Sequence, residues 1–211
     1  ELIMNENLLS IEKRSSINGT FWKKRFDNDY KDSNQSSSSN LNNILETILY
    51  GRKLKKEDFD DFLDPKVSNL LIDPSKLFDM DVAINEIIAA MVDNKKIGII
   101  GDYDVDGTTS SSLLTNFFDH YNISSDVYIP NRLKDGYGPN ISAFKKFIEK
   151  DIDTVITVDC GSTSIDPLDY AHQNGIKVII IDHHKVDTHL PKCFAHINPT
   201  RKEDKSNLNH L

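Results

Sequence analysis

Three aspartates at alternate positions follow directly after an apolar run in the stretch IGIIGDYDVDGTTSSSLL, residues 97–114. They are Asp102, Asp104 and Asp106. Clustered carboxylates suit either a structural calcium loop or the acidic floor of a metal-dependent catalytic site. In an extended segment, side chains at i, i+2 and i+4 point to one face. The spacing therefore predicts that all three carboxylates reach one pocket.

The calcium interpretation requires the pattern of an EF-hand loop, which the three aspartates and Gly107 match over its first half. The bidentate glutamate of that loop would fall at position 113, which is Leu113. The segment before the aspartates is also a β-rich apolar run rather than a helix. The sequence therefore favours the catalytic interpretation.

Potential metal ligands also follow two later apolar runs. Asp159 ends one run, and the pair His183 and His184 ends the next. Taken alone, an acidic loop is more often solvated, a single aspartate more often a turn residue, and a histidine pair more often at the surface. Together they supply the carboxylates and imidazoles that suit Mn²⁺ or Mg²⁺. Two such ions can promote attack of water on a phosphodiester.

These ligands are placed by alternating strands and helices. Runs of Val and Ile without polar alternation are typical of strands buried on both faces of a parallel sheet. The fold class is therefore α/β: doubly wound, mainly parallel, with helices on both faces. The predicted strands are residues 96–100, 126–130, 153–159 and 176–182, the last of the set. The predicted helices are residues 109–120, 140–149 and 165–174.

The turn after the first predicted strand has residues suited to close backbone approach and to the start of a helix. Gly101 and Gly107 permit close backbone approach there. Residues 108–110 are expected to cap the following helix, whose amino end favours anions such as phosphate. In a parallel sheet, ligands bind at the carboxyl ends of strands. The three groups of ligands are therefore expected to converge.

Three segments are expected along the 211 residues: a flexible polar segment (1–43), a helical lead-in (44–94) and the α/β domain (95–211). The helix at the end of the lead-in is expected to bury one stripe, formed by Ile84, Ile87, Ile88 and Met91. The net charge of −8 argues against a protein that coats nucleic acid by charge alone. Two cysteines and no bilayer-length apolar stretch predict a cytoplasmic protein without a membrane partner.

At these residues the sequence resembles the DHH phosphoesterase superfamily. IDHHKV is similar to its Asp-His-His signature, and GDYDVDGTTS and TVDCGS are similar to its first two metal motifs. Other stretches resemble the bacterial members that are exonucleases specific for single-stranded DNA; they include FLDPKVSNLL, VYIPNRLKDGYG and HINP. The resemblance covers roughly residues 44–200.

The resemblance implies a 5′-to-3′ exonuclease that hydrolyses single-stranded DNA to mononucleotides with two Mn²⁺ or Mg²⁺ ions, in DNA repair and recombination. A helicase and a single-strand-binding protein are its expected partners. It also implies site residues. The metal ligands are Asp104, Asp106, Asp159 and His183, the catalytic residues are Asp102 and His184, and a basic contact to the 5′ phosphate is Arg132.

Two residues have alternative interpretations. Arg132 is either that phosphate contact or, from the residues alone, part of a surface salt bridge. Tyr137 is either a stacking platform for a base or a turn residue packed beside Gly136 and Gly138. The family also has a further metal-binding aspartate downstream and a second domain. The chain is therefore expected to be an amino-terminal fragment with an incomplete metal site and doubtful activity of its own.

Two rival functions remain open. One is a DHH phosphodiesterase acting on short oligonucleotides, cyclic dinucleotides or pyrophosphate. The other is a non-catalytic replication scaffold of the same superfamily. A scaffold has no physical need to gather mutually repelling carboxylates, so it predicts negligible Mn²⁺ binding.

Overall fold

The computed structural model describes residues 16–21 and 41–209 of the chain. The predicted flexible segment, residues 1–43, therefore lies outside the described residues except for 16–21 and 41–43. The chain divides into two compact units, Glu1–Ile72 and Asp73–Leu211. Among its described residues, the first unit contains the helical elements α1 (Leu41–Gly51), η3 (Lys56–Asp58), α2 (Phe59–Leu63) and α3 (Val67–Leu70).

The second unit is built on one parallel sheet with strand order β2-β1-β3-β4-β5. Its strands are β1 (Ile97–Gly101), β2 (Ser125–Tyr128), β3 (Thr154–Val158), β4 (Lys177–Ile181) and β5 (Ala195–Ile197). The α/β fold class and the first four strands are confirmed. The sequence analysis was wrong to end the sheet at residue 182, because β5 adds a fifth strand beside β4.

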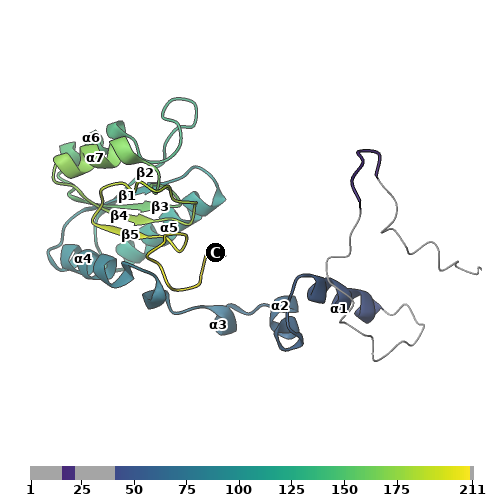
Figure 1. The fold of residues 1–211 in the computed structure, drawn as a ribbon. Coiled ribbons are helices and arrows are strands. Elements are labelled where there is room, and N and C mark those ends of the chain that lie inside the picture. Colours follow the sequence, from purple (N-terminus) through teal and green to yellow (C-terminus); the bar gives the residue numbers. More distant parts are fainter. Residues whose placement is uncertain (1–15, 22–40, 210–211) are drawn as a thin grey trace, which may run out of the picture. The chain divides into compact units, whose positions relative to one another are not determined.

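Helices cover both faces of this sheet (Figure 1). One face packs against α4 (Met80–Val92) and α5 (Val105–His120), through a core that includes Ala83, Phe118, Ile99 and Ile179. The other packs against α6 (Ile141–Glu149) and α7 (Ile165–Gln173), through a core that includes Phe144, Phe147, Leu168 and Val155. Every residue of β1 and β3 is buried, as expected for strands with helices on both sides.

The order of the strands reverses between β1 and β3. From β1 the chain runs through α5 to the edge strand β2, then crosses to β3 and continues through β4 to β5. In doubly wound sheets, ligands bind outside the carboxyl ends of the strands at such a reversal. The carboxyl ends of β1 and β3 lead directly into Asp102 and Asp159.

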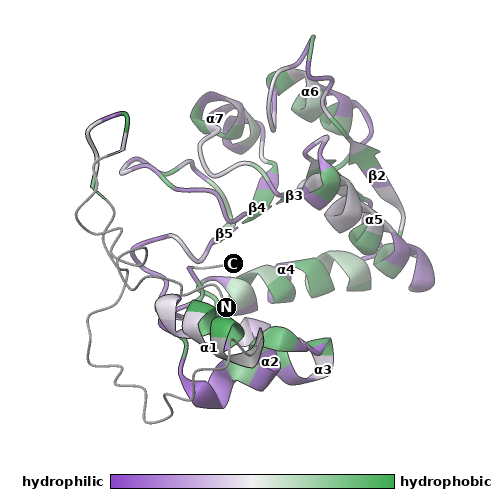
Figure 2. Cartoon of the chain, turned by 90° about the vertical axis from the view of Figure 1, so that its right-hand side faces the viewer, coloured by the Kyte–Doolittle hydropathy of each residue, from purple (hydrophilic) through white to green (hydrophobic). Residues whose placement is uncertain are grey.

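Helix α4 buries only part of the predicted stripe: Ile87 and Met91 are partly buried against the core as expected, whereas Ile84 and Ile88 are not. Ala83 and Ala90 are fully buried against the sheet, while Ile84 is 40% exposed and Ile88 is 51% exposed. The small alanines let the helix approach the sheet closely, and the helix is apolar on most sides (Figure 2), so periodicity alone did not identify the whole buried side. Apolar as it is, α4 is too short to cross a lipid bilayer, as is every other apolar helix among residues 16–21 and 41–209.

Candidate metal centre

The turn from β1 into α5 presents the first two carboxylates. Asp102 follows β1 directly and is only 4% exposed. Asp104 caps α5: its Oδ1 accepts a hydrogen bond from the Gly107 backbone N–H at 3.1 Å, and this bond lowers the pKa of Asp104. Gly107 is required here, because a Cβ at this position would lie 2.4 Å from the backbone N and O of Asp102.

The predicted extended arrangement of the three aspartates is wrong. Since α5 begins at Val105, the extended backbone ends at Asp104 and Asp106 lies in the first helical turn. The cap is Asp104 rather than residues 108–110. The hydroxyls of Thr108 and Thr109 instead donate to the backbone carbonyls of Asp104 and Val105, both at 2.6 Å.

Asp159 follows β3 and faces this turn. Its φ of 61° lies in the left-handed region, which non-glycine residues rarely adopt and which clusters at functional sites. The Asp159 backbone N–H donates to the carbonyl of Ile181 at 2.9 Å, so the strained residue is fixed to the end of β4. The residue is 7% exposed, and its Oδ1 lies 3.2 Å from His183 Nε2.

The histidine pair follows β4 and is organised by Asp182, which the sequence analysis did not select. Asp182 Oδ1 accepts hydrogen bonds from the backbone N–H groups of His183 (2.8 Å) and His184 (3.2 Å) and lies 2.8 Å from His184 Nδ1. Burial alone would raise the pKa of Asp182, but the hydrogen bonds from Ser162 and His184 lower it. Burial likewise opposes protonation of His184, yet Asp182 raises its pKa.

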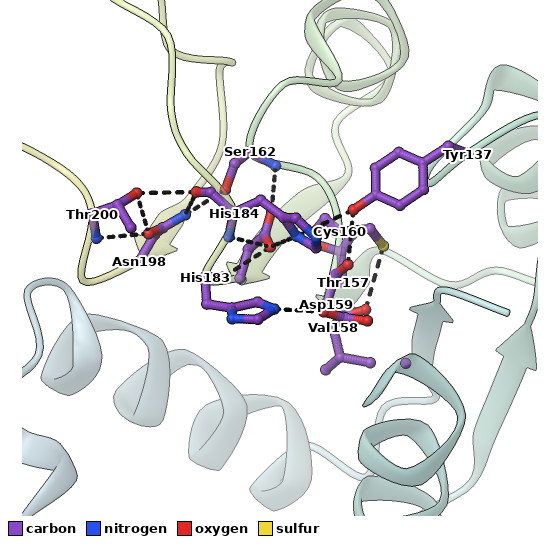
Figure 3. A network of polar contacts seen from close by, with 12 residues as sticks. Tyr137, Thr157, Val158, Asp159, Cys160, Ser162, His183, His184, Asn198 and Thr200 are labelled. Atoms are coloured by element: carbon purple, nitrogen blue, oxygen red, sulfur yellow. Dashed lines mark hydrogen bonds and ion pairs between the residues drawn. The ribbon is translucent and has the colours of Figure 1, made fainter. Parts of the chain in front are cut away.

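Tyr137 also contacts this site. Its hydroxyl donates to the backbone carbonyl of Asp159 at 3.0 Å and lies 3.3 Å from His184 Nδ1 (Figure 3). Burial and the nearby carboxylates raise the pKa of the phenol, so the hydroxyl keeps its proton. Tyr137 is thus anchored by its hydroxyl to the metal-ligand loops, while 45% of the residue stays exposed.

Within the part of the chain that the structure describes, two groups of three ligands meet the distances of a metal site. Asp102, Asp104 and Asp159 form one group, and Asp159, His183 and His184 form the other. In each group one ligand atom per residue lies within 4.8 Å of the others. The two groups share Asp159, which is the arrangement expected of a carboxylate between two adjacent cations.

The electrostatics of the carboxylates fit this interpretation. Asp102 Oδ1 and Asp159 Oδ2 are buried without a hydrogen-bond partner, although buried polar atoms are normally satisfied. Burial first, and then the neighbouring Asp104, raise the pKa of Asp159 to about 6. Buried, unpaired and mutually repelling oxygens are what a divalent cation would neutralise. Oxygen ligands with imidazoles fit Mn²⁺ or Mg²⁺.

Asp106 stands apart from both groups. It is exposed on α5 and lines a cavity of about 340 Å³ together with Asp159, Asp182 and His183. The cavity is also lined by apolar residues, which are Leu77, Ile181, Ile197 and Pro199. The geometry therefore places Asp106 beside the two groups rather than within them.

Arg132 is likewise outside the two groups. It lies exposed in the loop after β2, with its guanidinium carbon 5.1 Å from the centre of the Tyr103 ring. Tyr103 stands between Asp102 and Asp104 in the sequence, so this cation–π contact connects Arg132 to the acidic turn. The contact is with an aromatic ring rather than the carboxylate that a surface salt bridge would supply.

The sequence analysis missed three residues that hold the ligands: Ser162, Asp182 and Asn198. Asp182 had a usable signal, because it directly follows the apolar run of β4 just as Asp102 and Asp159 follow theirs. Ser162 and Asn198 lie in the stretches TVDCGS and HINP, which resemble the family, but their spacing alone assigned them no role. They contact the histidine loop only because β3, β4 and β5 are neighbours in the sheet.

The sequence is similar to those of curated exonucleases. The single-stranded-DNA-specific exonuclease RecJ of Bacillus subtilis is 36% identical over 159 residues, covering 72% of this chain and 20% of the relative. RecJ of Haemophilus influenzae is 35% identical over 130 residues, covering 61% of this chain and 23% of the relative. The chain thus spans about a fifth of the length of these curated relatives.

Solved structures of exonuclease RecJ are also similar to this chain. Exonuclease RecJ bound to manganese superposes with a TM-score of 0.57 at 29% identity, over 63% of this chain and 34% of that chain. RecJ of Thermus thermophilus in complex with Mn²⁺ gives 0.54 at 25% identity, over 74% and 21%. The model of the DHH family, N-terminal domain, matches residues 96–209, which include both ligand groups. The chain therefore belongs to the DHH family.

Proposed function

We propose that this chain carries the metal-binding part of a 5′-to-3′ exonuclease that hydrolyses single-stranded DNA to mononucleotides. The observation that carries the proposal is Asp159, a buried aspartate with an unpaired oxygen that joins two ligand groups. The similarity to exonucleases specific for single-stranded DNA supplies the substrate class. Gathered carboxylates also argue against a scaffold, since without a cation they only repel one another.

Divalent ions would be held by Asp102, Asp104 and Asp159 on one side and by Asp159, His183 and His184 on the other. When bound, two Mn²⁺ or Mg²⁺ ions supply Lewis acidity toward the phosphate and the attacking water. Asp106 faces the adjoining cavity and is proposed as a ligand that completes the set when the site is loaded.

The protein's own groups orient these ligands. Asp182 engages Nδ1 of His184, so Nε2 is the nitrogen left to bind an ion or to hold a proton beside the scissile phosphate. Asp102 is proposed to act in the same acidic cluster at that phosphate. Water attacks phosphorus, the bond to the leaving 3′ oxygen breaks, and that oxygen takes up a proton to become a hydroxyl.

Arg132 is proposed to receive the 5′ phosphate, because its guanidinium is exposed and held over Tyr103 beside the acidic turn. A guanidinium recognises phosphate through paired N–H donors. We further propose that the protein works in the cytoplasm in DNA repair and recombination, beside a helicase and a single-strand-binding protein.

The test uses single-stranded DNA labelled at either the 5′ or the 3′ end, in Mn²⁺. Because the matched relatives are several times longer, the assay is run on the 211 residues and on the gene's complete product. We expect the 5′ label to appear at once as mononucleotide, while the 3′ label stays on strands that shorten gradually. Background nuclease is measured with the Asp159→Ala variant.

Other results would redirect or refute the proposal. Immediate release of the 3′ label would reverse the polarity, and internal fragments would indicate an endonuclease. If the complete product cleaves dinucleotides but leaves long single strands intact, the protein is a phosphodiesterase for short oligonucleotides or cyclic dinucleotides. No cleavage and no Mn²⁺ binding would favour the scaffold.

A further inference from the structure

Asn198 lies at the carboxyl end of β5, fully buried, in a network of hydrogen bonds that reaches the histidine pair (Figure 3). Its Nδ2 donates to Ser162 Oγ and to the backbone carbonyl of His184, both at 2.9 Å. Its Oδ1 accepts from the backbone N–H (2.9 Å) and the hydroxyl (2.8 Å) of Thr200. Asn198 thus uses two donors and two acceptor positions, the full capacity of an amide side chain.

The orientation of the amide follows from its backbone partners. The N–H of Thr200 can only donate, so it requires the oxygen of Asn198, and the carbonyl of His184 can only accept, so it requires the nitrogen. If the amide were reversed, its NH₂ group would face the N–H of Thr200 and its oxygen would face the carbonyl of His184. A donor would then meet a donor, and an acceptor would meet an acceptor. Asparagine therefore fits this position better than an aspartate of the same shape.

The network joins the loops that follow three neighbouring strands. Ser162 follows β3 and donates its backbone N–H to Asp182 Oδ2 at 3.0 Å, and its hydroxyl lies 2.9 Å from His196 Nε2 in β5.

The segment from Asp182 to Phe194 has no helix or strand, so the backbone of the histidine pair depends on side chains for its position. The carbonyl of His184 accepts a hydrogen bond from Asn198 Nδ2, and it also lies 3.0 Å from the Thr200 hydroxyl, whose single proton is shared between this carbonyl and Asn198 Oδ1. The N–H groups of His183 and His184 are both taken by Asp182. Asn198 is the residue that links the histidine carbonyl to the Ser162 loop.

We propose that Asn198 is a positioning residue of the metal centre, holding His183 and His184 in place against Asp159. It acts through the His184 carbonyl and the Ser162 hydroxyl and does not touch the reacting atoms. The inference rests on the proposed metal centre. Partners that orient metal ligands from outside the coordination sphere typically change metal affinity by about 10- to 100-fold when they are removed.

The decisive variant is Asn198→Asp, which keeps the oxygen that accepts from Thr200 and replaces the donating NH₂ with oxygen. We expect Mn²⁺ affinity, measured by calorimetry, to fall about 10-fold or more. In metal-free protein we expect the imidazole ¹⁵N signals of His183 and His184 to shift or broaden, while those of His120 and His172 stay unchanged. The matched control is Asn174→Asp, because exposed Asn174 also donates its Nδ2 to a backbone carbonyl, that of Tyr170 at 2.8 Å.

A purely structural role for Asn198 would lower the unfolding temperature but leave the histidine signals and the Mn²⁺ affinity of the folded variant at wild-type values, and that result would overturn the inference. If Asn198→Asp does not fold, the Thr200→Val variant is used to test the inference instead. This variant removes the hydroxyl proton that is shared between the His184 carbonyl and Asn198 Oδ1, and we expect a smaller change in the same direction. Wild-type signals and affinity in Thr200→Val would then refute the inference.

Failure of the proposed function gives a different pattern. If the wild-type protein binds Mn²⁺ but leaves single-stranded DNA intact, the exonuclease proposal is wrong, and the affinity of Asn198→Asp still decides the role of Asn198. If the wild-type protein binds no Mn²⁺, the metal centre and the role of Asn198 in it are both refuted.

Discussion

Strand β3 has an aspartate at each end, and their surroundings are opposite. Asp153, before the strand, accepts a hydrogen bond from Lys95 Nζ at 3.0 Å and another from the Thr154 hydroxyl at 3.1 Å. Partial burial would raise the pKa of Asp153, but these partners lower it. Asp159, after the strand, has an unpaired oxygen and a pKa raised to about 6. Lys95 therefore compensates the charge of Asp153, whereas Oδ2 of Asp159 is buried without a hydrogen-bond partner.

The largest expected effect is on turnover, when the carboxylate at each end of β3 is removed in turn. We expect Asp159→Ala to lower turnover on single-stranded DNA by about 1,000-fold or more, because a ligand shared by both groups is lost. Asp153→Ala removes a partly exposed ion pair and should leave turnover within about 2-fold. Steady-state rates of the gene's complete product measure both, and equal losses would contradict the assignment of Asp159.

The edge of the sheet at the carboxyl ends of its strands should also tolerate backbone changes less well than the opposite edge. Gly107→Ala forces a Cβ against the Asp102 backbone and should lower the free energy of unfolding by about 1–3 kcal/mol. We expect Mn²⁺ affinity to fall with it, since Asp102 is displaced. Gly175→Ala is the control: its positive φ of 76° also disfavours alanine, but no atom lies within 4 Å of the added Cβ.

Urea denaturation and calorimetry separate the two effects in these glycine variants. Gly175→Ala should lose about 1 kcal/mol of stability at most and bind Mn²⁺ like the wild type. Unchanged stability and affinity in Gly107→Ala would show that the turn can relax around the extra methyl group.

In metal-free protein, Asp159 should destabilise the fold near neutral pH. Its pKa is raised in the folded state, so its proton stabilises the fold below the unfolded pKa of about 3.8, and this contribution is lost as the pH rises through about 6. We expect Asp159→Asn to be more stable than wild type by roughly 1–3 kcal/mol at pH 7.5 and no more stable at pH 3.5. Thermal denaturation in EDTA tests this, and a constant difference across pH would contradict it.

A smaller effect is expected at Arg132. Arg132→Ala should weaken capture of 5′-phosphorylated DNA about 10-fold and change capture of 5′-hydroxyl DNA little, because only the phosphate requires the guanidinium. Lys134→Ala, in the same exposed loop, serves as the control. The ratio of KM values for the two kinds of end measures the effect, and an equal loss on both would remove the phosphate role.

The sequence predicted the interior of the sheet well. Strands β1 and β3 are unbroken runs of apolar and β-branched residues, so their positions follow from local sequence. Strand β5 is three residues long, Ala195–Ile197, and forms only because β4 offers it a parallel edge. A strand that depends on its neighbour gives no periodic signal of its own.

The ligand types of the site could be predicted, but their geometry could not. Carboxylates at strand ends identified Asp102 and Asp159, whereas the start of α5 was set by the side chain of Asp104, which turned Asp106 away from the two groups. Asn198 and Ser162 act through contacts between loops from different strands. Such contacts exist only once the sheet has formed, so the stretches TVDCGS and HINP could be recognised in the sequence, but the contacts of Ser162 and Asn198 could not be predicted from it.

The most direct test of the shared role of Asp159 is calorimetric titration of Mn²⁺ into the gene's complete product and its Asp159→Asn and Asp153→Asn variants. We predict that wild type and Asp153→Asn bind Mn²⁺ with equal affinity, and that Asp159→Asn loses measurable binding. Wild-type binding by Asp159→Asn, or no binding by the wild type, would contradict the account.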